Sequence, residues 1–333
     1  MVRPWVPRVT FRFRLAEADV APNATHVLLG AGGCVGTALA AALVARGDRV
    51  RLVSRSGCAT TGAESCAADL LDPAAVAKSI DEGSVVYLLA GLRYDRRVWA
   101  DQWPRIMRNV VDACSARDAR LIFFDNVYMY GPVEGPMTED SAVKPSSRKG
   151  RVRARIADDV LTAARAGRLR ACIARSADFY GPHCATSVLN VLALAPLAKR
   201  GRAKWQANPD LPHSFTYVPD CARALPLLAD AEDVWTQVWH MPTAAPPLTG
   251  RELVALAARH MGVQPRLMVL RPWMLRAAGL FDRTIAELVE MLYQYTRPYV
   301  FDSSKFERRF GFRPTPYSDG LAQTASGFRQ ERG

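Results

Sequence analysis

The fold of this chain is decided by residues 26–47, which read HVLLGAGGCVGTALAAALVARG. Residues 27–29 are a short apolar run, which is typical of a buried strand. A glycine-rich loop follows directly, and the alanine and leucine content of residues 37–46 predicts a helix that ends at Gly47. The segment therefore predicts a strand, a glycine loop and a helix in immediate succession.

The loop glycines are spaced as Gly30-x-x-Gly33-x-x-Gly36. We expect the first glycine to allow a tight turn, the second to let the backbone approach a phosphate, and the third to let the helix pack closely on the strand. The N-terminus of the helix would present free N–H groups and a partial positive charge to that phosphate. In this context the loop predicts a binding site for the pyrophosphate of a dinucleotide.

Strands and helices continue to alternate after the loop. This order predicts an α/β fold of the Rossmann type, a doubly wound parallel sheet with helices on both faces. We expect an N-terminal extension over residues 1–24 with a short strand at 9–15, a dinucleotide-binding domain over 25–180, and a smaller substrate-binding lobe over 181–333 with segments returning to the sheet. The expected further strands are 49–53, 85–89, 120–124 and 169–174, and the expected helices are 73–79, 104–116, 151–166, 187–199, 220–229, 250–261 and 284–293.

Composition excludes several classes of protein. The chain has 333 residues, of which 49% are hydrophobic and 23% charged, and it contains no run of about 18 apolar residues and no signal-peptide pattern. We therefore expect a cytoplasmic, soluble protein with no membrane partner. The seven cysteines lack a C-x-x-C pair and the five histidines are dispersed, so we expect reduced cysteines and no metal.

The net charge of +12 is spread along the chain. Basic residues are not gathered between aromatic ones in a single segment, so we expect no nucleic-acid partner. An excess of positive charge does favour attraction of an anionic cofactor.

A series of short motifs follows the glycine loop in a characteristic order. With these motifs the chain resembles the extended short-chain dehydrogenase/reductases, also called the NAD-dependent epimerase/dehydratase family, from about residue 25 almost to the C-terminus. The motifs are Ala67-Ala68-Asp69-Leu70, Leu89-Ala90-Gly91, Asn109, Tyr130-Gly131-Pro132, Thr138-Glu139-Asp140, Phe179-Tyr180-Gly181-Pro182 and Tyr217-Val218-Pro219-Asp220.

The resemblance implies a set of cofactor contacts. Asp69 and Leu70 would contact adenine, Ala90 and Gly91 would line the cofactor ribose, and residues 176–180 would lie beside the nicotinamide. Two alternatives stay open: Asp69 caps the helix near residue 73, and Ala90-Gly91 is only an exit turn. The expected cofactor residues are Gly30, Gly32, Gly33, Cys34, Val35, Gly36, Ser54, Arg55, Asp69, Leu70, Ala90, Gly91, Arg153, Asp178 and Phe179. The resemblance also implies a homodimer formed through residues 100–115 and 149–166.

The end of the second strand predicts NADP(H) rather than NAD(H). NAD-selective folds place a carboxylate about 20 residues after the glycine loop to bond the ribose 2′-hydroxyl. Here Ser54 and Arg55 follow Val53, with no acidic residue. A guanidinium at this point suits a 2′-phosphate. The alternative is that Arg55 is an ordinary loop arginine.

The catalytic positions depart from the family pattern. The family uses a Ser or Thr, a Tyr, and a Lys one helical turn after the Tyr. The matching positions here hold Asn126, Lys149 and Arg153. We expect Lys149 to transfer a proton, because Arg148, Arg151 and Arg153 would favour its neutral form by like-charge repulsion. Tyr128 is the second candidate, and the alternative for Lys149 is a solvated residue at the start of a basic helix.

Two functions follow from these residues. The first is an NADPH-dependent oxidoreductase that reduces a small organic carbonyl or imine, in which the protein supplies orientation and a proton. The second keeps the cofactor without net redox turnover, as a lyase, an isomerase or a cofactor-binding regulator. A purely scaffolding role is disfavoured because the glycine loop is intact.

Overall fold

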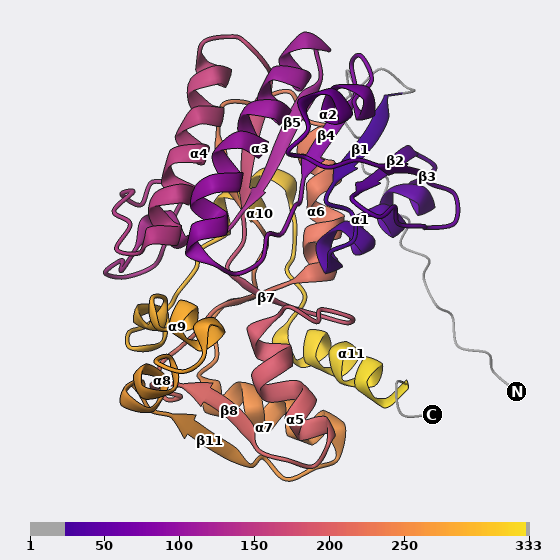
Figure 1. Cartoon of the computed structure of the whole chain (residues 1–333). Helices are drawn as coiled ribbons and strands as arrows, with labels where there is room; N and C mark the ends of the chain where they lie inside the picture. Colours follow the sequence, from indigo (N-terminus) through magenta and orange to yellow (C-terminus); the bar gives the residue numbers. More distant parts are fainter. Residues whose placement is uncertain (1–23, 331–333) are drawn as a thin grey trace, which may run out of the picture.

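The computed structural model describes residues 24–330, and its centre is a seven-stranded sheet of order β10-β6-β5-β4-β1-β2-β3 (Figure 1). Every neighbouring pair in this sheet is parallel. This confirms the predicted α/β fold with a Rossmann-like parallel sheet. The strands are β1 (Thr25–Leu29), β2 (Arg49–Ser54), β3 (Glu64–Ala67), β4 (Val85–Leu88), β5 (Arg120–Asp125), β6 (Ala171–Arg175) and β10 (Val238–His240).

The direction of strand addition reverses at the centre of this sheet. From β1 the chain first builds β2 and β3 on one side, and then returns to add β4, β5 and β6 on the other side. The carboxyl ends of β1 and β4 therefore flank the topological switch point, where ligands of open α/β sheets bind. The glycine loop leaves β1 at this point.

Helices cover both faces of the sheet. On one face α1 (Cys34–Arg46) packs on α6 (Val218–Ala229), and their buried residues share an apolar core with β1, β2 and β4. On the other face lie α2 (Pro73–Ser79), α3 (Arg96–Ala116) and α4 (Arg148–Arg165), which share a second core with the sheet. Buried residues on both faces explain the nearly continuous apolar runs of the strands.

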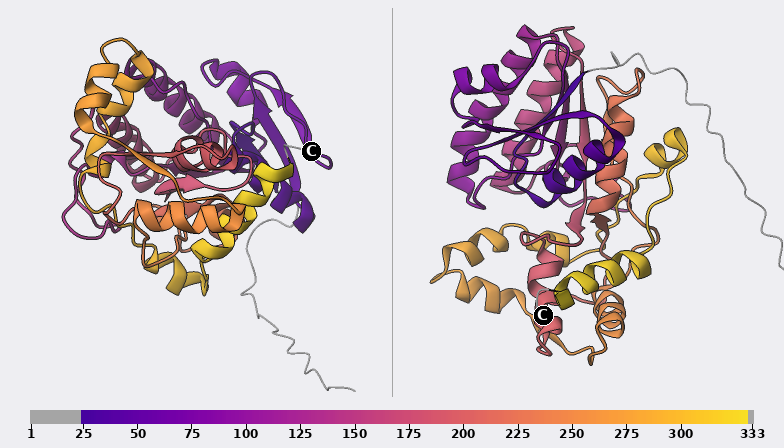
Figure 2. Two further views of the ribbon diagram at one scale, coloured as in Figure 1. Left: turned by 90° about the horizontal axis from the view of Figure 1, so that it is seen from below. Right: turned by 90° about the vertical axis from the view of Figure 1, so that its right-hand side faces the viewer.

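A smaller lobe lies below the carboxyl edge of the sheet (Figures 1 and 2). It contains two short parallel strand pairs and a third apolar core. Its elements are β7 (Asp178–Tyr180), the π-helix Asn190–Leu194, α5 (Ala195–Ala198), β8 (Ala203–Gln206), β9 (Phe215–Tyr217), α7 (Gly250–Met261), β11 (Leu267–Leu270), α8 (Pro272–Ala278), α9 (Arg283–Val289), the 3-10 turn Leu292–Tyr295 and α11 (Tyr317–Gln330), while α10 (Ser304–Phe310) packs beside β10.

Helix α3 begins eight residues earlier than the sequence predicts, and α1 and α4 begin three residues earlier; side-chain caps explain the starts of α3 and α4. The carboxylate of Asp95 accepts hydrogen bonds from the backbone N–H groups of Arg97 and Val98, so α3 starts eight residues before Pro104 and contains this proline. The hydroxyl of Ser147 caps α4 in the same way, which brings Lys149 into the helix. The strand expected at residues 9–15 lies outside the described residues.

Two further observations concern membrane and metal binding. None of the helices in the described part of the chain is long and apolar enough to span a membrane. Among residues 24–330 no group of three or more His, Cys, Asp or Glu side chains is arranged to hold a metal ion.

A buried polar chain joins β5, β6 and β10. The guanidinium of Arg175 donates to the hydroxyl of Tyr130 over 2.7 Å, and this hydroxyl lies 2.9 Å from Nε2 of His240. The other ring nitrogen of His240, Nδ1, lies 2.7 Å from the carbonyl of Asp302. A carbonyl can only accept, so Nδ1 carries the proton and Tyr130 donates to Nε2. Burial lowers the pKa of His240 to about 3, and the pKa of His26 on β1 is likewise lowered to about 4.

These two histidines predict that acid destabilises the fold. The unfolded chain binds a proton on each near pH 6.5, while the folded chain does not until about pH 4 or below, so the unfolding free energy falls as the pH drops from 7 toward 4. At pH 5 the loss is about 2 kcal/mol for each histidine. Urea titrations at pH 7 and pH 5 should show this loss, and His240→Gln should show about half of it. An unfolding free energy that does not change between the two pH values would contradict the prediction.

Candidate functional site

The glycine loop has the conformation that a pyrophosphate requires. Gly30 has a φ of +90°, and a Cβ placed there would lie 2.5 Å from the Cα of Ala90 at the end of β4. A Cβ at Gly36 would lie 2.6 Å from the carbonyl oxygen of Ala31. At Gly33 the only atom near an added Cβ is the Gly30 oxygen at 3.9 Å. The packing of the loop itself therefore requires glycine at positions 30 and 36, whereas the space beside Gly33 is open.

The N-terminus of α1 faces that open space. Gly33 is its N-cap, no side chain caps the helix, and its first turn contains no acidic residue. The predicted loop residues Gly32, Gly33 and Cys34 are at least partly exposed, while Val35 is buried in the core. Uncapped N–H groups beside an open backbone surface fit a pyrophosphate.

The strands on either side of the switch point place the other predicted cofactor residues. Ser54 ends β2 and Arg55 follows it, exposed to solvent. Leu70 is buried, and its carbonyl accepts a 2.9 Å hydrogen bond from the side chain of Asn109. The carboxylate of Asp69 bonds the backbone of Leu71. The N-cap of α2 is Asp72, so the alternative that Asp69 caps this helix is wrong.

Asn126 and Tyr128 follow β5 at the same edge of the sheet. The side-chain oxygen of Asn126 accepts a hydrogen bond from the backbone of Tyr128, which fixes the turn. The hydroxyl of Tyr128 lies 3.4 Å from that of Tyr94, and its ring stacks on Trp99. Burial raises the pKa of Tyr128, and the negative charge of Asp178 raises it further. Tyr128 is therefore a neutral phenol at neutral pH.

Lys149 is fully buried, and its ammonium group is enclosed by acceptors. Nζ donates to the carboxylate of Glu287 over 2.6 Å, to that of Glu290 over 2.8 Å, and to the backbone carbonyl of Glu287 over 2.9 Å. Both glutamates lie on or beside α9 of the smaller lobe. Arg148 and Arg151 are exposed to solvent, and the charged groups that contact the ammonium are these two carboxylates, so the expectation that basic residues surround Lys149 is wrong. The catalytic role of Lys149 stays a prediction.

Arg153 lies one helical turn further along α4 and is also buried. Its guanidinium lies 4.2 Å from the ring centroid of Trp103, 4.9 Å from that of Trp99, and 3.3 Å from a carboxylate oxygen of Asp125. Burial lowers the pKa of Arg153 and raises that of Asp125, although each opposes the shift of the other. The contact of Arg153 with ribose or phosphate stays a prediction. The position of its guanidinium among aromatic rings does not favour such a contact.

Asp178 is the first residue of β7, the first strand of the smaller lobe. Its carboxylate lies 3.0 Å from Nε2 of His213 and accepts a hydrogen bond from the hydroxyl of Tyr295 over 3.1 Å. His213 is itself stacked between Tyr295 and Tyr299. Phe179, the next predicted cofactor residue, packs against the core beneath α1. Asp178 thus belongs to an aromatic cluster below the sheet edge.

With this geometry established, comparison with known proteins identifies the family. Residues 26–238 match the model of the NAD dependent epimerase/dehydratase family, well over half of the chain. The chain belongs to this family. No curated protein sequence matches the chain.

Three solved structures of the same fold share 16–19% sequence identity with the chain. The UDP-glucose 4-epimerase of Thermus thermophilus in complex with NAD has a TM-score of 0.73 at 19% identity, with 92% of this chain and 99% of that chain covered. DesIV, the dTDP-glucose 4,6-dehydratase of Streptomyces venezuelae, has a TM-score of 0.74 at 19% identity over 93% and 98%. The UDP-glucuronic acid 4-epimerase of Bacillus cereus has 0.74 at 16% identity over 92% and 99%.

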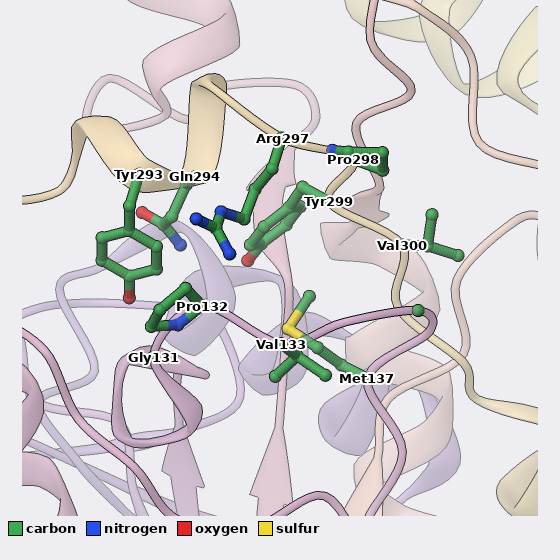
Figure 3. Close-up of a pocket in the computed structure, with 11 residues that line it drawn as sticks. Gly131, Pro132, Val133, Met137, Tyr293, Gln294, Arg297, Pro298, Tyr299 and Val300 are labelled. Atoms are coloured by element: carbon green, nitrogen blue, oxygen red, sulfur yellow. The ribbon is translucent and has the colours of Figure 1, made fainter.

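A hollow separates the loop after β5 from the segment that follows α9. It is small, with a cavity volume of about 10 Å³, and is lined by residues of both regions. Figure 3 shows Tyr293 and Arg297 extending from the smaller lobe toward Pro132. We find no hydrogen bond or ion pair from Arg297 to another described residue, so this exposed guanidinium can meet an anionic group of a ligand.

Sequence reasoning missed the residues that complete this site. Tyr94, Glu287, Glu290 and Arg297 carry no motif that it recognised. The segment 284–293 was expected to be helical, but its sequence does not indicate that it meets α4. Spacing within one helix could have paired Glu287 with Glu290 on one face, although not with Lys149.

The loop geometry predicts how two glycine substitutions differ. Gly33→Val should fold, because an added Cβ there has space and the backbone φ of −82° suits any residue, yet its side chain would cover the surface that the pyrophosphate needs. Calorimetric titration should show at least a tenfold loss of NADPH affinity with about the same unfolding temperature. Gly36→Ala should instead lower the unfolding temperature. A Gly33→Val variant with unchanged affinity would mean that the loop is only a turn.

Proposed function

We propose that this family member is an NADP(H)-dependent oxidoreductase that reduces a small organic carbonyl or imine, with Tyr128 as the proton donor. When bound, the nicotinamide supplies the hydride. The observation that carries the proposal is the Tyr128 hydroxyl, which stands at the carboxyl edge of β5, next to β4 and the switch point, with a phenol as its hydrogen-bond partner.

The cofactor is supported by the loop and by the relatives. The loop offers uncapped N–H groups to a pyrophosphate, and the structures of the Thermus thermophilus and Streptomyces venezuelae relatives contain NAD. Arg55 distinguishes NADP(H) from NAD(H), because its exposed guanidinium follows β2, next to the loop, and would pair with a 2′-phosphate.

The protonation state of Tyr128 suits the role of proton donor in a reduction. Reduction of a carbonyl needs a neutral donor beside the developing alkoxide, which is more basic than a phenolate. The raised pKa of Tyr128 keeps this donor protonated. Oxidation of an alcohol would need the phenolate as base, and burial disfavours that charge. The carboxamide of Asn126, two residues earlier, is close enough in the chain to orient the substrate oxygen.

Lys149 supports this site indirectly. Its three ammonium hydrogens are directed to three acceptors, so none is left for a substrate. Arg297 would bind an anionic part of the substrate at the hollow in Figure 3.

One observation favours a second candidate function. Asn126, Lys149 and Arg153, which occupy the three catalytic positions of the family, all make buried or turn-stabilising contacts. A regulator that binds the cofactor without turnover would need these residues only for such structural contacts. Absence of NADPH consumption with every member of a panel of aldehydes, ketones and imines would favour this function over the reductase.

Cofactor preference can be tested at Arg55. Calorimetry should show NADPH binding at least tenfold more tightly than NADH, since a 2′-phosphate gains a charge-assisted bond. Arg55→Ala should remove most of this difference and leave NADH affinity unchanged. Arg49→Ala, at the opposite end of β2, is the matched control and should change neither affinity. Equal affinities for the two cofactors in the unmodified protein would refute the preference.

The proton donor can be tested with paired variants on whichever substrate of the panel is turned over. Tyr128→Phe should lower kcat about a hundredfold while NADPH affinity changes less than about twofold, because the variant removes only the transferable proton. Lys149→Met should lower the unfolding temperature, and kcat per folded molecule should stay within about threefold. The reverse pattern, with Tyr128→Phe active and folded Lys149→Met inactive, would assign proton transfer to Lys149.

A further inference from the structure

Helices α8 and α9 form a hairpin over residues 272–289 at the outer edge of the smaller lobe (Figures 1 and 2). Three of its exposed side chains are large and apolar. Phe281 is 93% exposed, Leu280 82% and Trp273 65%. Within residues 24–330 the other exposed large apolar residues are Val143 and Val191, which lie elsewhere in the sequence. Contiguous apolar surface of this kind marks a binding site, whereas apolar residues exposed singly need no explanation.

Packing between the two helices directs one face of α8 to solvent. Leu275 is the buried residue of α8, and a Cβ at Gly279 would lie 3.1 Å from the backbone of α9, so the helices meet along this side. Gly279 keeps a helical φ of −65°, which continues the helical spacing to the next residue. Trp273, Arg276 and Leu280 are three and four residues apart and therefore share the opposite face.

Arginine side chains lie within and beside this apolar face. Arg271, Arg276 and Arg283 belong to the hairpin or directly precede it, and all three are exposed to solvent. Among the described residues, the side chains of Arg271 and Arg276 have no hydrogen bond or ion pair. The single acidic residue of positions 264–286 is Asp282, and its carboxylate caps α9. The hairpin therefore presents positive charge without a matching negative charge.

The positive charge continues from the hairpin to the start of α3. Arg283 forms a 2.7 Å ion pair with Asp95, the cap of α3, and Arg93 lies 3.6 Å from the same carboxylate. Two guanidinium groups thus share one carboxylate, and their side chains remain 61% and 74% exposed. Arg97, in the first turn of α3, is also exposed. The surroundings of the apolar face are therefore suited to an anionic partner.

We propose that this hairpin docks on the surface of a membrane that contains anionic lipids. Trp273, Leu280 and Phe281 enter the boundary between headgroups and acyl chains, while the arginines pair with the anionic headgroups. Arg276 suits a place within the apolar face, because its stem packs on apolar neighbours while its guanidinium reaches the headgroups. The contact does not depend on the reaction proposed for Tyr128.

Contact with the surface of a bilayer needs no long apolar run. We therefore replace the expectation of no membrane partner, which the lack of such a run supports only for spanning segments.

A second copy of the chain fits this face less well. A twofold interface brings the same patch of two copies together. Arg276 lies within the apolar face, so two copies of its guanidinium would be buried near each other with no free carboxylate on either hairpin. The net charge of +12 also repels two copies of the chain. An anionic lipid surface supplies the opposite charge that a second copy lacks.

Flotation of the full chain with lipid vesicles tests the docking. The chain should float with phosphatidylcholine vesicles that contain about one third phosphatidylserine, and should bind pure phosphatidylcholine vesicles at least about tenfold more weakly. Phe281→Ser and Arg276→Gln should each lower binding to the anionic vesicles about fivefold or more. Both side chains are exposed, so the unfolding temperature should not change. Val191→Ser is the matched control, because it removes an exposed apolar side chain outside the hairpin, and it should bind as the unmodified chain does.

Tryptophan fluorescence tests whether the hairpin enters the lipid. Vesicles whose acyl chains carry bromine should quench the emission of the unmodified chain, and Trp273→Phe should lose most of this quenching. Quenching retained in Trp273→Phe, or flotation unchanged in Phe281→Ser, would assign membrane contact to another part of the chain and overturn the proposal. A lack of flotation would also overturn it. A concentration-dependent dimer that Phe281→Ser abolishes would instead assign this face to a second copy.

Discussion

A buried ammonium group lies where the smaller lobe packs on α4 of the sheet domain. Lys149 on α4 donates to both carboxylates of Glu287 and Glu290 and to a backbone carbonyl, so all three of its hydrogens are used. Glu287 also accepts from the backbone and guanidinium of Arg96 at the start of α3. Burial of such charges costs several kcal/mol for each ion and is tolerated only where every donor meets an acceptor. Loss of one partner would leave an uncompensated charge, at a cost of about 3–5 kcal/mol. This arrangement stabilises the packing of α9 on α4, together with the ion pair between Arg283 and Asp95.

The next turn of α4 also carries a buried charge, but its surroundings are aromatic. Arg153 lies among Trp99, Trp103 and Phe123, where a guanidinium is accepted because its faces stack on rings and Asp125 supplies the opposite charge. Asp125 is shared with Arg175, which continues into the chain of Tyr130 and His240. Thus α4 contacts the smaller lobe through Lys149 and the core of the sheet domain through Arg153. This leaves Tyr128, just after β5, as the donor in the proposed function.

The sequence predicted the parts of the molecule that depend on local pattern. Gly30, Gly33 and Gly36 had the roles of turn, open surface and close packing because each role is decided by the backbone within a few residues. Helix starts were less well predicted, since the caps Asp95 and Ser147 lie before the apolar periodicity begins. The surroundings of Lys149 could not be predicted from the sequence. Its sequence neighbours are cations, but Arg148 and Arg151 are exposed to solvent, and the carboxylates that it contacts are 138 and 141 residues away. A single sequence does not show which distant helix will pack on α4.

In the proposed function, cofactor binding and catalysis depend on different chemical groups. The proposed pyrophosphate site would consist of backbone N–H groups, a helix dipole and the absence of side chains at glycines. Such a site would be insensitive to replacements on α4 and β5. Proton transfer, by contrast, depends on the identity of a few side chains, each of which can be replaced without disturbing the loop. Lys149, at the position that the resemblance matches to the family's tyrosine, is buried opposite Glu287 and Glu290, because an isolated ammonium could not be buried there. The burial of Lys149 and the packing of α9 against α4 thus depend on the same three charges.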